Sequence, residues 1–200
     1  MLLKGEVVEV NNILQLCGLL VIAIGWLISY RSARLRDQKI EEEKQKILYL
    51  NEQLSKFYGP IYSLLLENDR IRLIIQKQMG RDVIFPVGHS LTKDELKIWT
   101  HYLENFLIPN NRLILNTIEN NVHLIQGVRF PEEYLDWIDH AIGYELLHKQ
   151  YLDIGKEYGF YSIINFPKEF RESIVNSISQ LKKRQQELVK IDLPSPFEDK

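Results

Sequence analysis

The hydrophobic pattern of the chain is dominated by one uninterrupted apolar segment near its N-terminus. Residues 13–30 read ILQLCGLLVIAIGWLISY and contain no charged side chain. As a helix, about eighteen residues span roughly 27 Å, close to the lower limit for crossing the hydrocarbon core of a membrane. The pattern predicts a single transmembrane helix, with residues 1–12 as a short tail outside.

The charges on either side of this segment are unequal, and they predict its orientation. Lys4 is the only basic residue before the segment, whereas residues 31–39 contain three arginines and a lysine. The positive-inside rule places the basic side in the cytosol, so we expect an inner or plasma membrane protein with its N-terminus outside. A cleaved signal peptide is disfavoured, because the basic residues follow the apolar run and residues 29–32 offer no small-x-small cleavage site.

Behind the anchor, a periodic pattern predicts a long helix through residues 33–79. Its apolar seam has residues three and four apart, with a single polar member. The seam comprises Ile47, Leu50, Leu54, Phe57, Ile61, Leu64, Asn68, Ile71 and Ile75. Residues 31–46 are charged and are interpreted as a solvated stalk. The seam either forms a coiled coil with a second copy or packs against later helices of its own chain, and the second interpretation is favoured.

A glycine-proline pair interrupts the seam, so we expect either a kink or a new helix beginning at Pro60. Aromatic residues gather here, and we call Phe57, Tyr58, Pro60 and Tyr62 the aromatic bend. The bend is a candidate interaction site, although core packing is favoured because aromatic side chains usually stabilise by burial. Tyr158, Phe160 and Tyr161, in the connection of residues 153–165, are further interaction candidates.

The remaining pattern predicts three or more helices separated by short breaks. Thr92 and Glu95 form a capping box that begins a helix, which Pro109 is expected to end. Asn110 or Asn111 would then cap the next helix, which leads to Gly127. Further helices begin at Pro131 and Pro167. No β-rich stretch of comparable strength is present, so the fold class is all-α, with a cytosolic helical bundle at residues 47–192 and a tail at 193–200.

The apolar positions of the last two helices follow from the same spacing. In the helix after Pro131, one side is expected to be lined by Leu135, Ile138, Ile142 and Leu146. The apolar surface of that helix is widened by Tyr134, Trp137 and Tyr144. In the last helix, the inner face comprises Phe170, Ile174, Ile178, Leu181 and Leu188.

The motif Leu-x-x-Phe-Tyr-x-Pro-x-Tyr, which begins at Leu54, resembles small bacterial membrane-anchored helical proteins. The similarity extends into residues 136–144 and 166–185 and so covers much of the part behind the anchor. The resemblance implies an α-helical cytosolic module behind one membrane anchor. It brings no established activity that could be assigned to particular residues.

One short motif has metal-binding chemistry. Glu145 and His148 form an ExxH pair, with His140 on the same helix, a spacing that aims ligands at one metal in di-iron bundles. Those sites need a second ExxH pair, which the chain lacks, so the metal-dependent enzyme remains a secondary hypothesis. Phosphate-loop, dinucleotide and HExxH motifs are absent from the sequence, and Cys17 is the only cysteine. We predict no cofactor and favour binding over catalysis.

These features together predict a membrane-anchored interaction or recruitment module. Shared confinement in the bilayer raises effective concentration, which favours self-association. Besides the lipid bilayer and a second copy, the sequence identifies no protein partner. The formal net charge of −2 does not indicate the basic surface that nucleic-acid binding requires. A membrane-perturbing bacterial defence or toxin effector is a further alternative.

Overall fold

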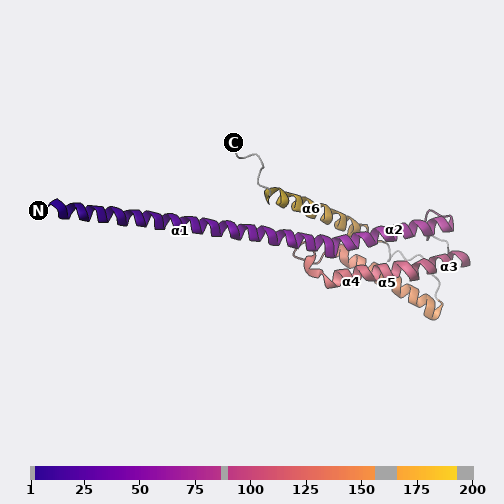
Figure 1. Ribbon diagram of the computed structural model, residues 1–200. Coiled ribbons are helices and arrows are strands. Elements are labelled where there is room, and N and C mark those ends of the chain that lie inside the picture. The colour runs from indigo at the N-terminus through magenta and orange to yellow at the C-terminus, as the bar shows by residue number, and fades with distance from the viewer. Residues whose placement is uncertain (1–2, 87–89, 156–165, 193–200) are drawn as a thin grey trace. The chain divides into compact units, whose positions relative to one another are not determined.

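The computed structural model describes residues 3–86, 90–155 and 166–192, and throughout these ranges the regular elements are helices (Figure 1). The all-α prediction is thus confirmed. The elements in chain order are α1 (Leu3–Glu52), η1 (Gln53–Tyr58), α2 (Gly59–Met79), α3 (Lys93–Tyr102), η2 (Leu103–Leu107), α4 (Ile108–Asn120), η3 (Val122–Leu124), α5 (Glu132–Ile154) and α6 (Lys168–Asp192). The segments η1 and η2 are π-helical, and η3 is a 3₁₀ turn.

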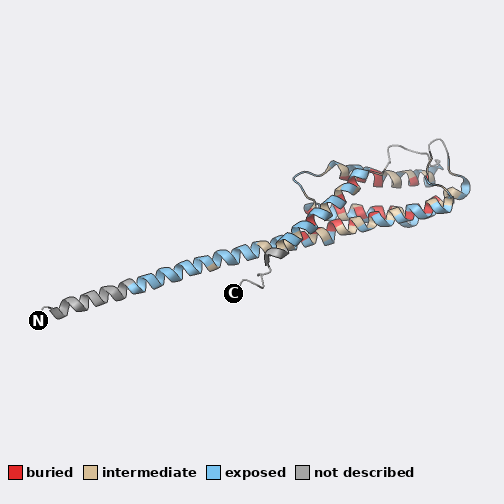
Figure 2. Ribbon diagram, turned by 90° about the horizontal axis from the view of Figure 1, so that it is seen from above, coloured by how far each residue is buried: buried red, intermediate tan, exposed pale blue. Residues whose placement is uncertain are grey.

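The chain divides into two compact units, Met1–Leu48 and Tyr49–Lys200. In the first unit, α1 is long and apolar enough to cross a membrane: an 18-residue window has a mean hydropathy of 1.3 and is entirely unburied. The described side chains of this segment are exposed (Figure 2). Near its basic end the rings of Trp26 and Tyr30 stack with centroids 5.8 Å apart. Such an aromatic pair is typical of a membrane interface.

The second unit contains two hydrophobic clusters. The larger joins η1, α2, α4, α5 and α6, and its centre is aromatic. Trp137 on α5 stacks on Phe170 of α6 with ring centroids 4.9 Å apart, and Tyr134 meets Phe170 edge-on at 5.0 Å. The smaller cluster lies around Ile75 and Trp99, where α2 meets α3. Burial of this much aromatic surface stabilises the unit more than any polar contact in it.

The apolar seam packs inside its own chain. Phe57, Ile61 and Ile75 are fully buried, and α2 contacts α3, α4 and α6. The structure therefore agrees with the intramolecular interpretation of the seam from Leu50 onward. The buried members of the seam are therefore not part of the outer surface of α2.

The prediction that Pro109 ends a helix is wrong. The chain continues from α3 through η2 directly into α4, where Pro109 is the second residue. The amide of Ile108, just before the proline, donates to the carbonyl of Leu103, five residues back. Such a π turn shifts the backbone hydrogen bonds of the helix by one residue. The N–H group that Pro109 lacks would therefore fall where the regular i to i−4 hydrogen bonds are already interrupted.

The same arrangement occurs at the aromatic bend. Gly59 donates its amide to the carbonyl of Leu54, again five residues back, and Pro60 follows as the second residue of α2. Both sites share the spacing Leu-x-x-Phe-x-x-Pro, at residues 54–60 and 103–109. A new helix thus begins at the proline without a loop, and the repeat of this spacing was a signal that the sequence reading missed.

The capping box at the start of α3 is confirmed. The hydroxyl of Thr92 accepts from the amide of Glu95 at 3.3 Å, and the carboxylate of Glu95 accepts from the amide of Thr92 at 2.8 Å. Arg81, in the loop after α2, binds the same carboxylate at 2.7 Å. This ion pair joins the start of α3 to the end of α2.

Asn110 and Asn111 do not cap a helix, contrary to the prediction. Both are buried inside the continuous helical run and bind Asn68 of α2. Asn110 donates to the Oδ1 atom of Asn68 at 2.9 Å, and Asn68 donates to the Oδ1 atom of Asn111 at 3.1 Å. The polar member of the seam therefore has its partners on α4, which satisfies the buried amides.

The apolar residues of α5 divide between two sides of the helix. Three of the aliphatic side chains face outward, with Leu135, Ile142 and Leu146 exposed to 51, 44 and 55 %. The inward face carries aromatic, histidine and alanine side chains instead. These buried residues are Tyr134, Trp137, His140, Ala141 and His148. The larger rings fill the space against α6 better than the aliphatic chains would, so burial of aromatic surface determines which face turns inward. On α6, the predicted inner residues Phe170, Ile174 and Leu181 are all fully buried.

Candidate functional site

Glu145, one of the three metal candidates, binds an arginine on a neighbouring helix. The Nε atom of Arg112 on α4 lies 3.0 Å from its Oε2 atom, and the Nη2 atom binds Oε1. The guanidinium lowers the pKa of the Glu145 carboxyl below its usual value, and the carboxylate raises that of Arg112. A carboxylate held on both oxygens by arginine serves as a link between α4 and α5.

The two histidines have different surroundings. The Nε2 atom of His148 lies 3.1 Å from the Oε1 atom of Glu104 in η2. His140 is enclosed by rings, with the centroids of Tyr144, Trp137 and Phe166 at 4.8, 5.3 and 5.6 Å. Across the residues that the structure describes, no group of three His, Cys, Asp or Glu side chains could hold a metal ion. The predicted candidates therefore do not form a ligand set.

The aromatic bend is part of the core. Phe57 is fully buried and Tyr58 is 1 % exposed, while Pro60 and Tyr62 are half-buried. Phe57 and Tyr58 are thus not a docking surface, because η1 turns both rings against α5 and the loop that follows η3. Tyr158, Phe160 and Tyr161, the other aromatic candidates, lie outside the described residues.

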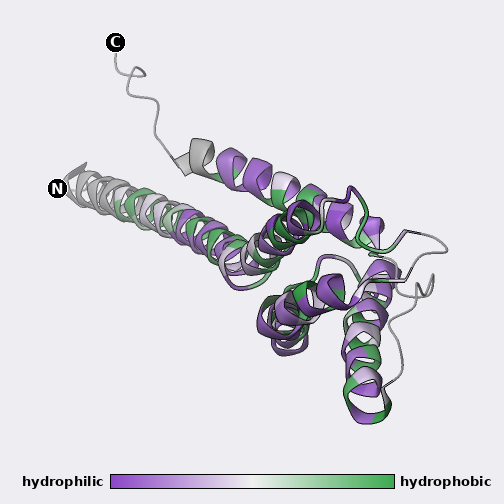
Figure 3. Ribbon diagram, turned by 90° about the vertical axis from the view of Figure 1, so that its right-hand side faces the viewer, coloured by the Kyte–Doolittle hydropathy of each residue, from purple (hydrophilic) through white to green (hydrophobic). Residues whose placement is uncertain are grey.

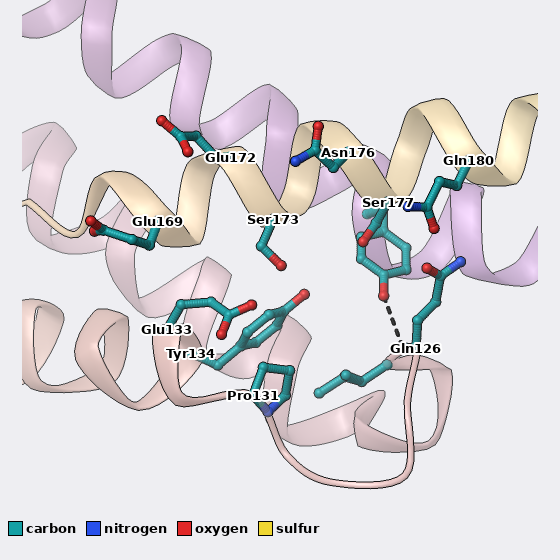
Figure 4. Close-up of a pocket in the computed structure, with 12 residues that line it drawn as sticks. Gln126, Pro131, Glu133, Tyr134, Glu169, Glu172, Ser173, Asn176, Ser177 and Gln180 are labelled. Carbon is teal, nitrogen blue, oxygen red and sulfur yellow. Dashed lines mark hydrogen bonds between the residues drawn. The ribbon is translucent and has the colours of Figure 1, made fainter.

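A cavity of about 540 Å³ opens between the start of α5, the first half of α6 and the loop before α5 (Figure 4). Most of its lining is polar. The lining residues are Tyr58, Ile125, Gln126, Pro131, Glu133, Tyr134, Glu169, Glu172, Ser173, Asn176, Ser177 and Gln180. Six of them follow one face of α6, which is a mostly hydrophilic helix (Figure 3). The volume falls within the range of small-molecule sites, so we call this cavity the polar pocket.

The inner wall of the polar pocket is built from two buried tyrosines. The hydroxyl of Tyr58 accepts from the backbone amide of Gln126 at 2.9 Å. Burial raises the pKa of Tyr134 far above its usual value, and a hydrogen bond with Tyr58 and the charge of Glu133 add to this rise. Tyr134 therefore stays protonated at physiological pH and keeps its hydrogen-bond donor.

The mouth of the polar pocket is acidic. Glu133, Glu169 and Glu172 contribute three carboxylates, and among the described residues no lysine or arginine lines the cavity. None of the three forms an ion pair with another described residue, in contrast to Glu95 and Glu145. The sequence reading missed this site, although a signal was present in the polar stripe of α6, with Glu169, Glu172, Ser173, Asn176, Ser177 and Gln180 at helical spacing.

The outward face of α5 is the second surface feature of the unit. We call Leu135, Ile142 and Leu146 the aliphatic row, because they lie seven and four residues apart on one side of the helix. No described residue packs over them closely enough to bury them. The outward side of α5 therefore mixes these exposed aliphatic side chains with charged ones, among them the exposed Asp139 between Leu135 and Ile142.

No family model, curated protein or solved structure matches the chain. The resemblance to small membrane-anchored helical proteins consequently depends on the sequence patterns alone, at the aromatic bend and in residues 136–144 and 166–185. Function has to be argued from the geometry of the aliphatic row and of the polar pocket.

Proposed function

We propose that the protein is a single-pass membrane protein whose cytosolic helical unit acts as an interaction module that self-associates through the aliphatic row of α5. The membrane part is supported by the uncharged, unburied first unit and by the basic residues that follow it. The orientation follows the positive-inside rule. The recruitment function follows from the combination of an anchor with a separately packed helical unit.

One observation carries the binding part of the proposal: three aliphatic side chains are exposed on the outward side of α5, around Asp139. A helix at the surface of a soluble domain usually has one apolar side and one charged side. Leu135, Ile142 and Leu146 depart from that rule, and each keeps about half of its surface in water. Three aliphatic side chains in one line on a helix form the kind of face that another helix covers.

The occupant that we propose is the aliphatic row of a second copy. Two identical rows related by a two-fold axis bury each other completely, so no further partner surface is required. The contact is small compared with the area of about 1,200 Å² that stable complexes bury, and it would be weak between proteins free in solution. Two copies held in one membrane meet at a far higher effective concentration, which compensates for the small area.

The proposal is tested by the oligomeric state of full-length protein in lipid nanodiscs that hold two or more copies. We expect dimers for the unchanged protein and monomers for the double variant Ile142→Asp/Leu146→Asp. The matched control is Leu73→Asp, because Leu73 is 49 % exposed and belongs to another helix, α2. Dimers that persist in the double variant, or that disappear equally in the control, would contradict the proposal.

A further inference from the structure

The outward side of α5 carries charged residues between and beyond the members of the aliphatic row. Successive exposed positions along this side are four and three residues apart in turn, which is the spacing of a helix seam. We call these positions the outer seam of α5, and they are Leu135, Asp139, Ile142, Leu146, Lys149 and Asp153. Trp137 lies on the other side of α5, where it stacks on Phe170 of α6. The outer seam therefore faces away from the core.

The outer seam is symmetric about residue 144. Ile142 lies two residues before this position, and Leu146 lies two residues after it. Asp139 and Lys149 lie five residues before and after it. A two-fold axis perpendicular to α5 at residue 144 would bring each position of the seam opposite its counterpart in a second copy. An aliphatic side chain would then face an aliphatic side chain, and a carboxylate would face an ammonium group.

We propose that α5 pairs with α5 of a second copy in antiparallel orientation, with the two-fold axis at residue 144. This inference rests on the proposed self-association and adds the orientation and the register of the two helices. Asp139 of each copy forms an ion pair with Lys149 of the other, so the contact occurs twice. Ile142 and Leu146 form the apolar centre between the two ion pairs. At each end Leu135 faces Asp153, whose carboxylate stays in water.

The charges of the outer seam are not used within the chain. Asp139 and Lys149 are both exposed, and neither forms an ion pair with another residue that the structure describes. Glu145, one turn before Lys149, is bound by Arg112 instead. A charge between aliphatic side chains weakens an apolar contact unless it meets an opposite charge. The antiparallel pair gives Asp139 that partner.

Other arrangements of the same two helices lack this complementarity. In a parallel pair in register, Asp139 would face Asp139 and Lys149 would face Lys149, so both contacts would be repulsive. An antiparallel pair shifted by seven residues in one direction would place Asp139 against Ile142. The opposite shift would place Lys149 against Leu146. Each shift leaves a charge without a partner in the apolar centre, so the charges favour the register centred on residue 144.

Energy transfer between donor- and acceptor-labelled copies in liposomes tests the register, with full-length protein labelled at its N-terminus. The unchanged protein should show energy transfer. Asp139→Lys and Lys149→Asp, each studied alone, should raise the dimer dissociation constant roughly tenfold, because both ion pairs become like-charge contacts. A one-to-one mixture of the two variants should recover the energy transfer of the unchanged protein, because each contact between the variants again joins opposite charges.

The matched control exchanges charges on α6, which packs on the core side of α5. Glu187→Lys and Lys182→Asp change exposed residues, and neither variant nor their mixture should alter the energy transfer.

Three outcomes would overturn the inference. If Asp139→Lys and Lys149→Asp each dimerise as well as the unchanged protein, the register is wrong and the proposed self-association still stands. If Asp139→Lys pairs better with the unchanged protein than with Lys149→Asp, the helices are parallel. Absence of energy transfer in the unchanged protein would contradict both the register and the self-association.

Discussion

Arg112 binds Glu145 through two atoms of its guanidinium group, and this pair joins α4 to α5 beside the aromatic core. The Nε atom lies 3.0 Å from Oε2, and the Nη2 atom binds Oε1. The planar guanidinium matches a carboxylate in this geometry, which makes the pair more specific than a single contact from lysine. Both side chains remain partly in water, so the pair contributes more to the register of the two helices than to stability.

Replacement of Glu145 by glutamine should make the protein less stable, mainly at neutral pH. Because Arg112 lowers the pKa of this carboxyl in the folded protein, its stabilisation is present above the pKa of the unfolded chain, about 4.3, and is lost as the pH falls through the folded value. Glu145→Gln should lower the free energy of unfolding by about 0.5 kcal/mol at pH 7. The difference should be smaller at pH 3, below the unfolded value, than at pH 7.

Denaturant unfolding of the full-length protein in detergent at both pH values measures this difference. The control is Glu119→Gln, which removes an exposed carboxylate from the same helix as Arg112 and should have no effect at either pH. An equal loss at pH 7 and pH 3 would show that Glu145 acts by packing and not by charge.

Removal of the side-chain amide of Asn68 should destabilise the unit, because the buried side-chain amides of Asn110 and Asn111 lose their hydrogen-bond partner. Asn110 would lose its acceptor at 2.9 Å, and Asn111 would lose its donor at 3.1 Å. Buried polar groups left without partners cost roughly 1–3 kcal/mol, so Asn68→Ala should lower the free energy of unfolding by that amount. Asn116→Ala, at an exposed position of α4, serves as the control. Equal stability of the two variants in urea would refute this role.

Replacement of Gly59 by alanine should destabilise the protein, against the usual trend. Within a helix this change normally gains up to about 1 kcal/mol. At position 59, however, a Cβ atom would lie 2.5 Å from the carbonyl oxygen of Leu54, so the π turn would have to open. We expect a loss of roughly 1–3 kcal/mol in thermal unfolding followed by circular dichroism. Gly25→Ala, where nothing lies within 4 Å, should leave the transition unchanged.

Helices and their caps could be predicted from the sequence because their causes are local. The capping box of Thr92 and Glu95 needs only residues three apart, and the end of α2 follows from Gly80, which adopts a left-handed conformation. Pro109 misled the prediction because a proline breaks an α-helix but not a helix that contains a π turn just before it. Nothing in the local propensity of residues 103–108 indicates that turn, although the repeated spacing with residues 54–60 does.

The two candidate surfaces were harder to predict because both depend on tertiary packing. On α5 the spacing showed apolar residues on more than one side, and it is the packing of Trp137 on Phe170 that distinguishes the buried side from the exposed Leu146. The polar pocket joins Glu133 with Glu172, which are far apart in the chain and belong to different helices. The metal hypothesis depended on spacing along one helix and did not anticipate that Arg112, from another helix, would bind Glu145.

The most direct test of the central claim is disulfide cross-linking in native membranes. Cys17 is the only cysteine of the chain, so a Cys17→Ser background can carry one new cysteine at a time. If two copies meet through the aliphatic row, mild oxidation should convert Leu146→Cys and Ile142→Cys to covalent dimers, while Leu73→Cys on α2 stays monomeric. Equal dimer formation at all three positions, or formation at Leu73→Cys alone, would contradict the account.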